Sequence, residues 1–264
     1  MKSINIQYQT DLVFGSPASE HKFLLRILPR SDDRQRIVSL SWQIEPQGVL
    51  WRTHDGFGNE ALAGYIDPPH DKFCFGMSAM AEISDKPYTL CPEPERTLIY
   101  PSALTQPQSG LSDFYKQLDA TAPPPDEPLR RIEHFSRAVH SRMNYERGHT
   151  DNFTTAEEAL SVGSGVCQDY AHILLALLRL DKVPVRYGAG LASDYGETHA
   201  WVEAWTDGKF YGIDPTRDKF TDEGYVALSR GRDFKDCSVE RGIYKGACKG
   251  TQTITLSMEI AEES

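Results

Sequence analysis

The stretch GSGVCQDYAHILLALLRL (163–180) decides the fold, because a glycine-rich turn runs directly into an apolar helix. Apolar residues after the turn recur at the spacing i, i+3, i+4, i+7 and i+8, which predicts a helix that begins at about Cys167. They are Tyr170, Ile173, Leu174, Leu177 and Leu178. Alanine and leucine fill the flanks, so the helix is expected to be buried on nearly all sides.

Cys167 opens this predicted helix and is the first candidate for a reactive residue. The unpaired amides and the positive end of the dipole at a helix start favour the thiolate form of a cysteine. The alternative is that Cys167 is a small buried hydrophobic side chain. Its place after Gly163 and Gly165, which allow a tight turn, favours the reactive role without settling it.

The segments on both sides of this helix predict a core that contains both helices and strands. Upstream, apolar residues at helical spacing predict a helix of about 15 residues from Leu129. Thr155 and Glu158 then form a capping box for a short helix. Downstream, three strands are predicted, over residues 183–191, 198–205 and 210–213.

The first ~90 residues alternate polar and apolar side chains with a period of two, which predicts strands with one solvated face. The chain therefore runs β, α, β, an order that favours an α+β fold over a doubly wound parallel sheet. The Pro-rich segment 121–128 predicts an extended connector. We expect a β-rich N-terminal domain over 1–92, a connector over 93–128, and a catalytic core with C-terminal strands over 129–264.

The composition excludes several classes of protein. The chain has 264 residues, of which 39% are hydrophobic and 25% charged, and its net charge of −10 argues against nucleic-acid and anionic-membrane partners. No apolar run is long enough to span a bilayer, and the start lacks the pattern of a secretory signal, so we expect a cytoplasmic protein. Five cysteines without a Cys-x-x-Cys pair or a histidine cluster predict reduced thiols, no metal and no cofactor.

A hairpin register worked out from the sequence places a carboxylate beside an imidazole. If the Asp-Gly pair 207–208 forms a two-residue turn, Trp201 lies opposite Asp214. Because side chains alternate along a strand, His199 shares the face of Trp201 and lies one diagonal step from Asp214. Such neighbours are roughly 7 Å apart, which Asp and His side chains can bridge with a hydrogen bond. A one-residue bulge at the turn would break this register.

Three residues then have complementary chemistry. Cys167 would attack a carbonyl carbon as a thiolate, and its backbone N–H could stabilise the oxyanion. His199 would hold the thiol proton and later pass it to a leaving amine. Asp214 would orient the imidazole and stabilise its charged form. The alternatives are a strand histidine bonded to a backbone group and a turn aspartate before Pro215.

Five motifs resemble one known family. GVCQDYAH (165–172), THAWVEAW (198–205) and GIDPT (212–216) resemble the core motifs of the transglutaminase-like superfamily, with most similarity to its bacterial cysteine-protease-like branch. LRILPR (25–30) and DGFGN (55–59) resemble the β-rich N-terminal domain of that branch. The resemblance covers most of the chain, and three core motifs in the same order make it specific.

The resemblance implies a papain-like core in which the cysteine-bearing helix packs on an antiparallel sheet. It matches Cys167 to the family nucleophile, His199 to the base and Asp214 to the third member of the triad. Arg217 departs from the pattern, since the branch often has Asn there, and this change could alter the rim of the site.

Two further residues are candidates for supporting roles. Gln168 could help to stabilise an oxyanion or could simply cap the helix. Trp201 is expected to cover the hydrogen bond between His199 and Asp214, the alternative being a plain core position. His172, on another face of the helix than Cys167, is expected to be structural.

We therefore expect a thiol-dependent amide-bond hydrolase, a peptidase or amidase, that acts on a peptide or other amide substrate. Acyl transfer to an amine in place of water is an alternative that the residues do not separate from hydrolysis. A non-catalytic peptide-binding module is a third alternative. The substrate, the oligomeric state and the role of the front domain do not follow from the sequence.

Overall fold

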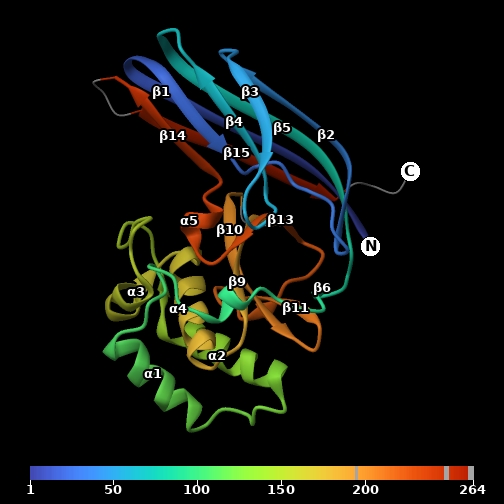
Figure 1. Cartoon of the computed structure of the whole chain (residues 1–264), viewed down its shortest axis with the longest axis vertical. Coiled ribbons are helices and arrows are strands. Elements are labelled where there is room, and N and C mark those ends of the chain that lie inside the picture. Colours follow the sequence, from blue (N-terminus) through green and yellow to red (C-terminus); the bar gives the residue numbers. More distant parts are fainter. Residues whose placement is uncertain (194–195, 247–249, 261–264) are drawn as a thin grey trace.

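The computed structural model describes residues 1–193, 196–246 and 250–260, which form two lobes (Figure 1). The upper lobe in Figure 1 is a curled antiparallel sheet, and the lower lobe packs helices against a second antiparallel sheet. The fold is α+β, as the order of the elements predicted.

The upper lobe contains a seven-stranded sheet organised around one long strand. Its strands are β1 (Lys2–Leu25), β2 (Gln35–Glu45), β3 (Val49–His54), β4 (Glu60–Ile66), β5 (His70–Ile83), β14 (Glu240–Lys245) and β15 (Gly250–Ile260). The first part of β1 pairs with β5 and its last part with β4, in the order β2-β5-β1-β4-β3. Ile4, Ile6 and Tyr8 are buried in its core, so the predicted alternation is confirmed there.

The two C-terminal strands belong to the upper sheet. We expected them with the catalytic core, whereas β14 pairs with residues 19–25 of β1 and β15 pairs with residues 4–14. The alternation of apolar residues in β15 indicates that one face is covered, but such a pattern does not name the partner strand. The chain thus ends by returning to the lobe in which it began.

The lower lobe holds a helical layer on one side of a six-stranded sheet (Figure 1). Its main helices are α2 (Pro128–Arg142), α3 (Ala156–Val162) and α4 (Cys167–Leu180), followed late in the chain by α5 (Phe234–Cys237). Its strands are β6 (Tyr88–Leu90), β9 (Val185–Ala192), β10 (Thr198–Thr206), β11 (Lys209–Asp214), β12 (Lys219–Phe220) and β13 (Tyr225–Gly231). Helix α4 packs against β9 and β10 and is buried over most of its length, as predicted.

The expected connector contains regular structure. A 3₁₀ turn, η1 (Arg96–Ile99), and a helix, α1 (Ser109–Asp119), lie within residues 93–128, and Leu111 of α1 is fully buried in the core of the lower lobe. The carboxylate of Glu157 in α3 accepts hydrogen bonds from the N-terminal amides of α1, including that of Gly110. Because this N-terminal cap comes from a segment far along the chain, the sequence around residues 109–119 does not contain the capping residue that would predict α1. The Pro-rich part precedes α2, as expected.

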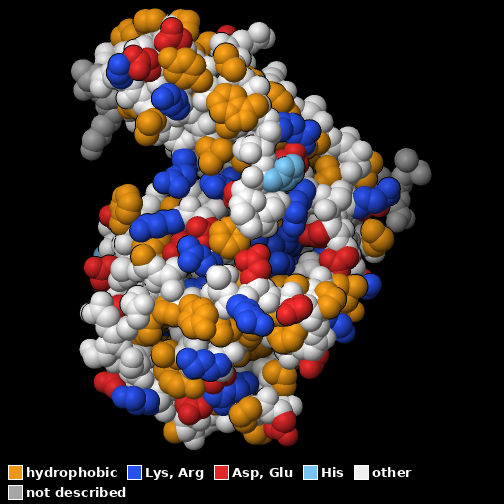
Figure 2. All heavy atoms as spheres, in the orientation of Figure 1, with side chains coloured by type: hydrophobic (Ala, Val, Ile, Leu, Met, Phe, Trp, Pro, Cys, Tyr) orange, Lys and Arg blue, Asp and Glu red, His pale blue; other side chains and the backbone are white. Residues whose placement is uncertain are grey.

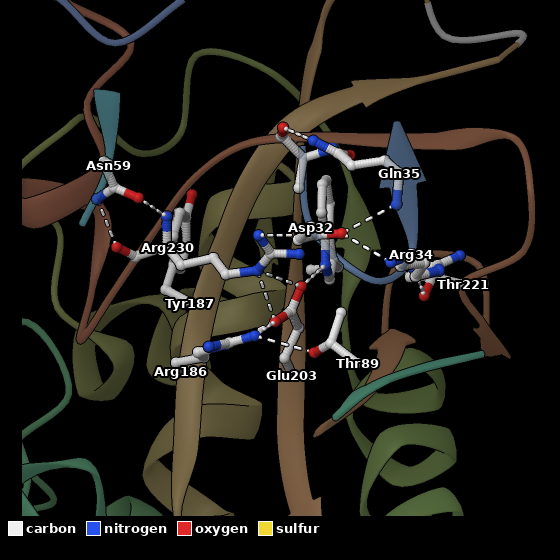
Figure 3. Close-up of polar contacts among 12 residues, drawn as sticks. Asp32, Arg34, Gln35, Asn59, Thr89, Arg186, Tyr187, Glu203, Thr221 and Arg230 are labelled. Carbon is white, nitrogen blue, oxygen red and sulfur yellow. Dashed lines mark hydrogen bonds and ion pairs between the residues drawn. The ribbon is translucent and has the colours of Figure 1, made fainter. Parts of the chain in front are cut away.

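Two amide side chains join the lobes at the edge of the lower sheet. Strand β13 ends the strand order β12-β11-β10-β9-β13, so its outer backbone groups need other partners. The Gln35 amide donates to the carbonyl oxygen of Ala227 (2.9 Å) and accepts from its N–H (2.8 Å). Asn59 makes the same pair of bonds to Arg230, both of 2.7 Å (Figure 3). Side chains of the upper lobe thus supply hydrogen bonds that a further strand would otherwise make to β13.

Replacing Asn59 with alanine should destabilise the protein by roughly 2–4 kcal/mol, because a buried N–H and a buried C=O would both lose their partner. The matched control is Gln7→Ala, which removes an exposed amide bonded to Ser78 on the same sheet and should cost less than about 0.5 kcal/mol. Urea denaturation of the three proteins measures this difference. Equal denaturation midpoints for the two variants would contradict the role given to Asn59.

Candidate active site

The hairpin of β10 and β11 has the register that the Asp-Gly turn predicted. Residues 207–208 have φ angles of 51° and 76°, as a type I′ turn requires, and Val202 pairs with Ile213 without a bulge. The register brings the two predicted partners together, with 2.7 Å between Nε2 of His199 and Oδ2 of Asp214. Both side chains are completely buried.

Among the described residues, three hydrogen-bond donors contact the carboxylate of Asp214. Besides His199, the N–H of Thr216 donates to Oδ1 (2.9 Å) and the hydroxyl of Tyr225 donates to Oδ2 (2.7 Å). Burial would raise the pKa of Asp214, but these hydrogen bonds, with that of His199 foremost, hold the pKa below its usual value. Asp214 is therefore a fixed anion beside the imidazole.

Tyr225 is a site residue that the sequence analysis missed. It begins β13, which reaches the site across β9, since Tyr225 pairs with Ala192. Tyr225 and Asp214 lie on strands that are not neighbours in the sheet, so no pattern within either strand indicates the contact. Only the order of the strands in the sheet brings its hydroxyl to the carboxylate.

Cys167 lies at the N-terminus of α4, as predicted, and its side chain is partly exposed. Gly163 before it has a φ of 74°, the left-handed conformation that ends α3. The carboxylate of Asp169 accepts a hydrogen bond from the N–H of Val166 (2.8 Å). The same carboxylate leaves no room for a side chain at Gly165, because a Cβ there would lie 2.4 Å from its Oδ2. These contacts give physical reasons for the Gly-Ser-Gly turn and set the position of the thiol.

Cys167 and His199 line one cavity of about 300 Å³. Gln168 lines it too, and the amide of Gln168 donates to the carbonyl oxygen of Asp151 (3.4 Å), which ties the side chain to the loop before α3. Arg147 and Glu197 line the same cavity from two different loops and form an exposed ion pair of 2.8 Å. The cavity is thus bounded by the start of α4, the start of β10 and the loops beside them.

The imidazole of His199 favours its charged form. Burial alone would lower the pKa of His199, but the hydrogen bond with Asp214 and then the interaction with Cys167 outweigh burial and raise the pKa to about 9. The raised pKa contributes to the stability of the folded state fully below about pH 6.5, and that contribution is lost as the pH rises through 9. A charged imidazole next to a cysteine favours a thiolate–imidazolium pair.

Trp201 meets the His–Asp pair through Tyr225. The indole is buried and packs edge-to-face against the Tyr225 ring, with 5.6 Å between the ring centroids. Its Nε1–H donates to Oε1 of Glu203 (3.3 Å). Gly188 and Gly190 in β9 leave room for the indole, since a Cβ on either would lie 2.6–2.7 Å from it. Tyr225 in turn donates its hydroxyl to the carboxylate of Asp214.

His172 has a structural contact. It is fully buried in α4, and its Nε2 accepts the backbone N–H of Phe234 in α5 (3.2 Å). Desolvation by burial lowers the pKa of His172 to about 4, so the ring is neutral and able to accept. This bond connects α4 to α5, and Phe234 lines the cavity of Cys167.

Within residues 1–193, 196–246 and 250–260, no group of three or more His, Cys, Asp or Glu side chains is placed to hold a metal ion. In the same ranges, no helix is both long and apolar enough to cross a membrane.

The fold and the motifs define a transglutaminase-like protein. Residues 113–215 match the model of the transglutaminase-like superfamily core, and residues 4–82 match that of the bacterial transglutaminase-like N-terminal region. The chain belongs to the transglutaminase-like superfamily and carries the N-terminal region of its bacterial members.

Relatives and one solved structure extend this match over the whole chain. An uncharacterized protein of Mycobacterium leprae is 28% identical over 98% of this chain and 99% of its own length. An uncharacterized protein of Mycobacterium tuberculosis is 29% identical over 82% of this chain and 79% of its own length. The crystal structure of a "Putative Cysteine Protease from Cytophaga hutchinsonii" superposes with a TM-score of 0.81 at 19% identity, over 100% of this chain and 93% of that one. That likeness shows the shared fold.

Limiting iodoacetamide at about pH 6 should alkylate Cys167 before the other cysteines, because a helix start and an imidazole stabilise its thiolate. By contrast, burial raises the pKa of Cys74 and of the fully buried Cys237. Peptide mapping by mass spectrometry measures the order of labelling; it also covers Cys248, which lies outside the described residues. A His199→Gln variant should lose the selectivity. Faster labelling of another cysteine would remove Cys167 as the candidate nucleophile.

The imidazole of His199 should titrate near pH 9 in the wild-type protein, and Asp214→Asn should move that titration to a lower pH. The substitution removes the main favourable interaction of the imidazolium and leaves burial, which opposes the charge. Nuclear magnetic resonance of the His199 ring nitrogens measures both values. An unchanged titration in the variant would show that Asp214 does not hold the charge.

Proposed function

We propose that this protein is a thiol-dependent amide-bond hydrolase, a peptidase or amidase, that acts through an acyl-enzyme on Cys167. The observation that carries the proposal is the buried pair of His199 and Asp214, 2.7 Å apart, next to a cysteine at a helix start in the same cavity. These three side chains supply a nucleophile, a base and an orienting carboxylate. Membership of the superfamily supports a thiol-dependent enzyme in general.

In the proposed first step, the thiolate of Cys167 attacks the carbonyl carbon of the substrate amide. The C–N bond then breaks as His199 gives its proton to the leaving amine, and a thioester remains on Cys167. Asp214 binds Nε2 of the imidazole, so Nδ1 is the nitrogen that serves the thiol and the leaving group. The unpaired amides in the first turn of α4 would stabilise the oxyanion, with Gln168 as a further donor.

In the second step, water attacks the thioester carbonyl carbon while His199 takes a proton from the water. The C–S bond then breaks, the acid product leaves, and Cys167 is regenerated. The proposed substrate is a peptide or another amide that binds in the cavity lined by Cys167, His199, Arg147 and Glu197. An amine that replaces water in this step would give acyl transfer, so the choice of acceptor separates a hydrolase from a transferase.

Incubation with a mixed peptide library, with and without a primary amine, tests the proposal. Mass spectrometry should detect an acyl adduct on Cys167 and free acid products, whereas Cys167→Ala should form neither. Asp214→Asn should lower turnover roughly 10²–10⁴-fold. The matched control is Cys91→Ala, because Cys91 is partly buried and contacts Trp205 through its backbone carbonyl, so turnover should be unchanged.

The products decide between the alternatives. Amine conjugates in place of acids would identify an acyltransferase and overturn hydrolysis. Saturable peptide binding without an adduct on Cys167, in a protein that is folded by its melting curve, would identify a binding module and overturn both catalytic functions.

A further inference from the structure

A buried ionic cluster in the lower sheet lies close to the interface between the lobes (Figure 3). At its centre is Glu203 of β10, whose side chain is only 4% exposed. Its carboxylate accepts from Nε of Arg186 in β9 (2.6 Å) and from Nε of Arg230 in β13 (2.9 Å). Desolvation by burial would raise the pKa of Glu203, but the two arginines lower it to about 2, so the carboxylate is charged.

The cluster continues into the upper lobe through Arg230. Its Nη1 lies 2.9 Å from Oδ2 of Asp32, in the loop before β2 (Figure 3). The other oxygen of Asp32 accepts the backbone N–H groups of Arg34 and Gln35, each at 2.9 Å. Asp32 therefore holds this loop in the conformation in which Gln35 pairs with the edge of β13.

The cluster also reaches towards the candidate triad. His199, Trp201 and Glu203 alternate along β10 and so share one face of the strand. Oε1 of Glu203 accepts the indole N–H of Trp201, which packs edge-to-face on Tyr225. The hydroxyl of Tyr225 donates to Asp214, 2.7 Å from its carboxylate oxygen. Each contact in this series lies in the buried part of the molecule.

We propose that the upper lobe positions the His199–Asp214 pair through the contacts Asp32–Arg230–Glu203–Trp201–Tyr225. The inference rests on the proposed function. Glu203, Trp201 and Tyr225 are positioning residues in this proposal, because they act through Asp214 and do not contact the reacting atoms. The upper lobe then contributes to catalysis as well as to the stability of the fold.

The physical basis is that a buried charge cluster tolerates few arrangements. Glu203 accepts hydrogen bonds from both arginines and from the indole, and it can do so only with its carboxylate in one position. The ion pair with Asp32 fixes the position of the Arg230 side chain. The indole, once fixed at its nitrogen, limits the tilt of the Tyr225 ring. A small misplacement of Asp214 is costly, since an error of about 1 Å in a reacting geometry can cost roughly 100-fold in rate.

Asp32→Asn is the central test, because it removes the upper lobe's charge from Arg230 and leaves every residue of β10 unchanged. We expect kcat to fall about 10- to 100-fold with KM nearly unchanged. The upper pH limit of kcat/KM, set by His199, should move to a lower pH. The groups that face His199 and contribute to this limit are Asp214, Cys167 and, through Asp214, Tyr225 and Arg217.

The matched control is Asp181→Asn, which removes the charge of one carboxylate partner of Arg131, in a similarly buried pair on the helical side of the lower lobe. It should lower the melting temperature and leave the pH profile and kcat per folded molecule unchanged. If Asp32→Asn behaves as this control does, with lost stability alone, the upper lobe does not position the triad and the proposal is overturned.

Trp201→Phe gives a second variant, which leaves every charged side chain of the ionic cluster in place. It keeps an apolar ring and loses the bond to Glu203, so we expect the same drop in kcat per folded molecule and the same shift of the pH limit. A lower melting temperature is expected as well, because the ring is smaller and a buried carboxylate oxygen loses its donor. Lost stability with an intact pH profile would leave Trp201 as a core residue and overturn its place in the series.

A readout without substrate separates this proposal from the proposed function. The titration of the His199 ring and the iodoacetamide rate of Cys167 should both change in Asp32→Asn, whatever reaction the protein performs. If the wild-type protein has no amidase activity but these two readouts shift, the proposed function fails and the positioning inference stands. If they stay at the wild-type values, the positioning inference fails independently.

Discussion

Strand β13 ends the strand order of the lower sheet, and the structure depends on how the backbone groups on its outer edge are satisfied. A buried edge without partners would cost several hydrogen bonds. The amides of Gln35 and Asn59 supply these bonds from the upper lobe. Because β13 also carries Tyr225 and Arg230, the strand that joins the lobes is the same strand that contacts Asp214 and Glu203.

The candidate site combines two kinds of construction. The start of α4 is built locally, from a left-handed glycine at 163 and a carboxylate at 169 that caps the turn before the cysteine. The imidazole–carboxylate pair is built by a tight hairpin, which is also local. The packing of α4 against β10 brings these two local structures together. This packing is a tertiary contact, which neither local structure determines by itself. The lobes and the hollow between them are visible in the space-filling view (Figure 2).

Much of the site could be predicted because its geometry follows from short-range rules. The Asp-Gly turn has a small set of conformations, so the register of the hairpin and the proximity of His199 to Asp214 followed from counting. The helix at Cys167 followed from a periodicity of 3.6 residues. Helix α1 and the partner of β15 could not be predicted, because an N-terminal cap from Glu157 and a pairing with β1 join segments far apart in the chain.

The sequence by itself determined the class of fold, the elements around Cys167 and the pairing of His199 with Asp214, since each depends on contacts between residues close in the chain. Only the tertiary structure decided that Tyr225 donates to Asp214, that Glu203 is surrounded by two arginines, and that the C-terminal strands return to the first lobe. These contacts depend on the order of strands in the sheets. Strand order is set by the burial of whole faces and by the compensation of buried charges, and no local pattern of residues encodes either.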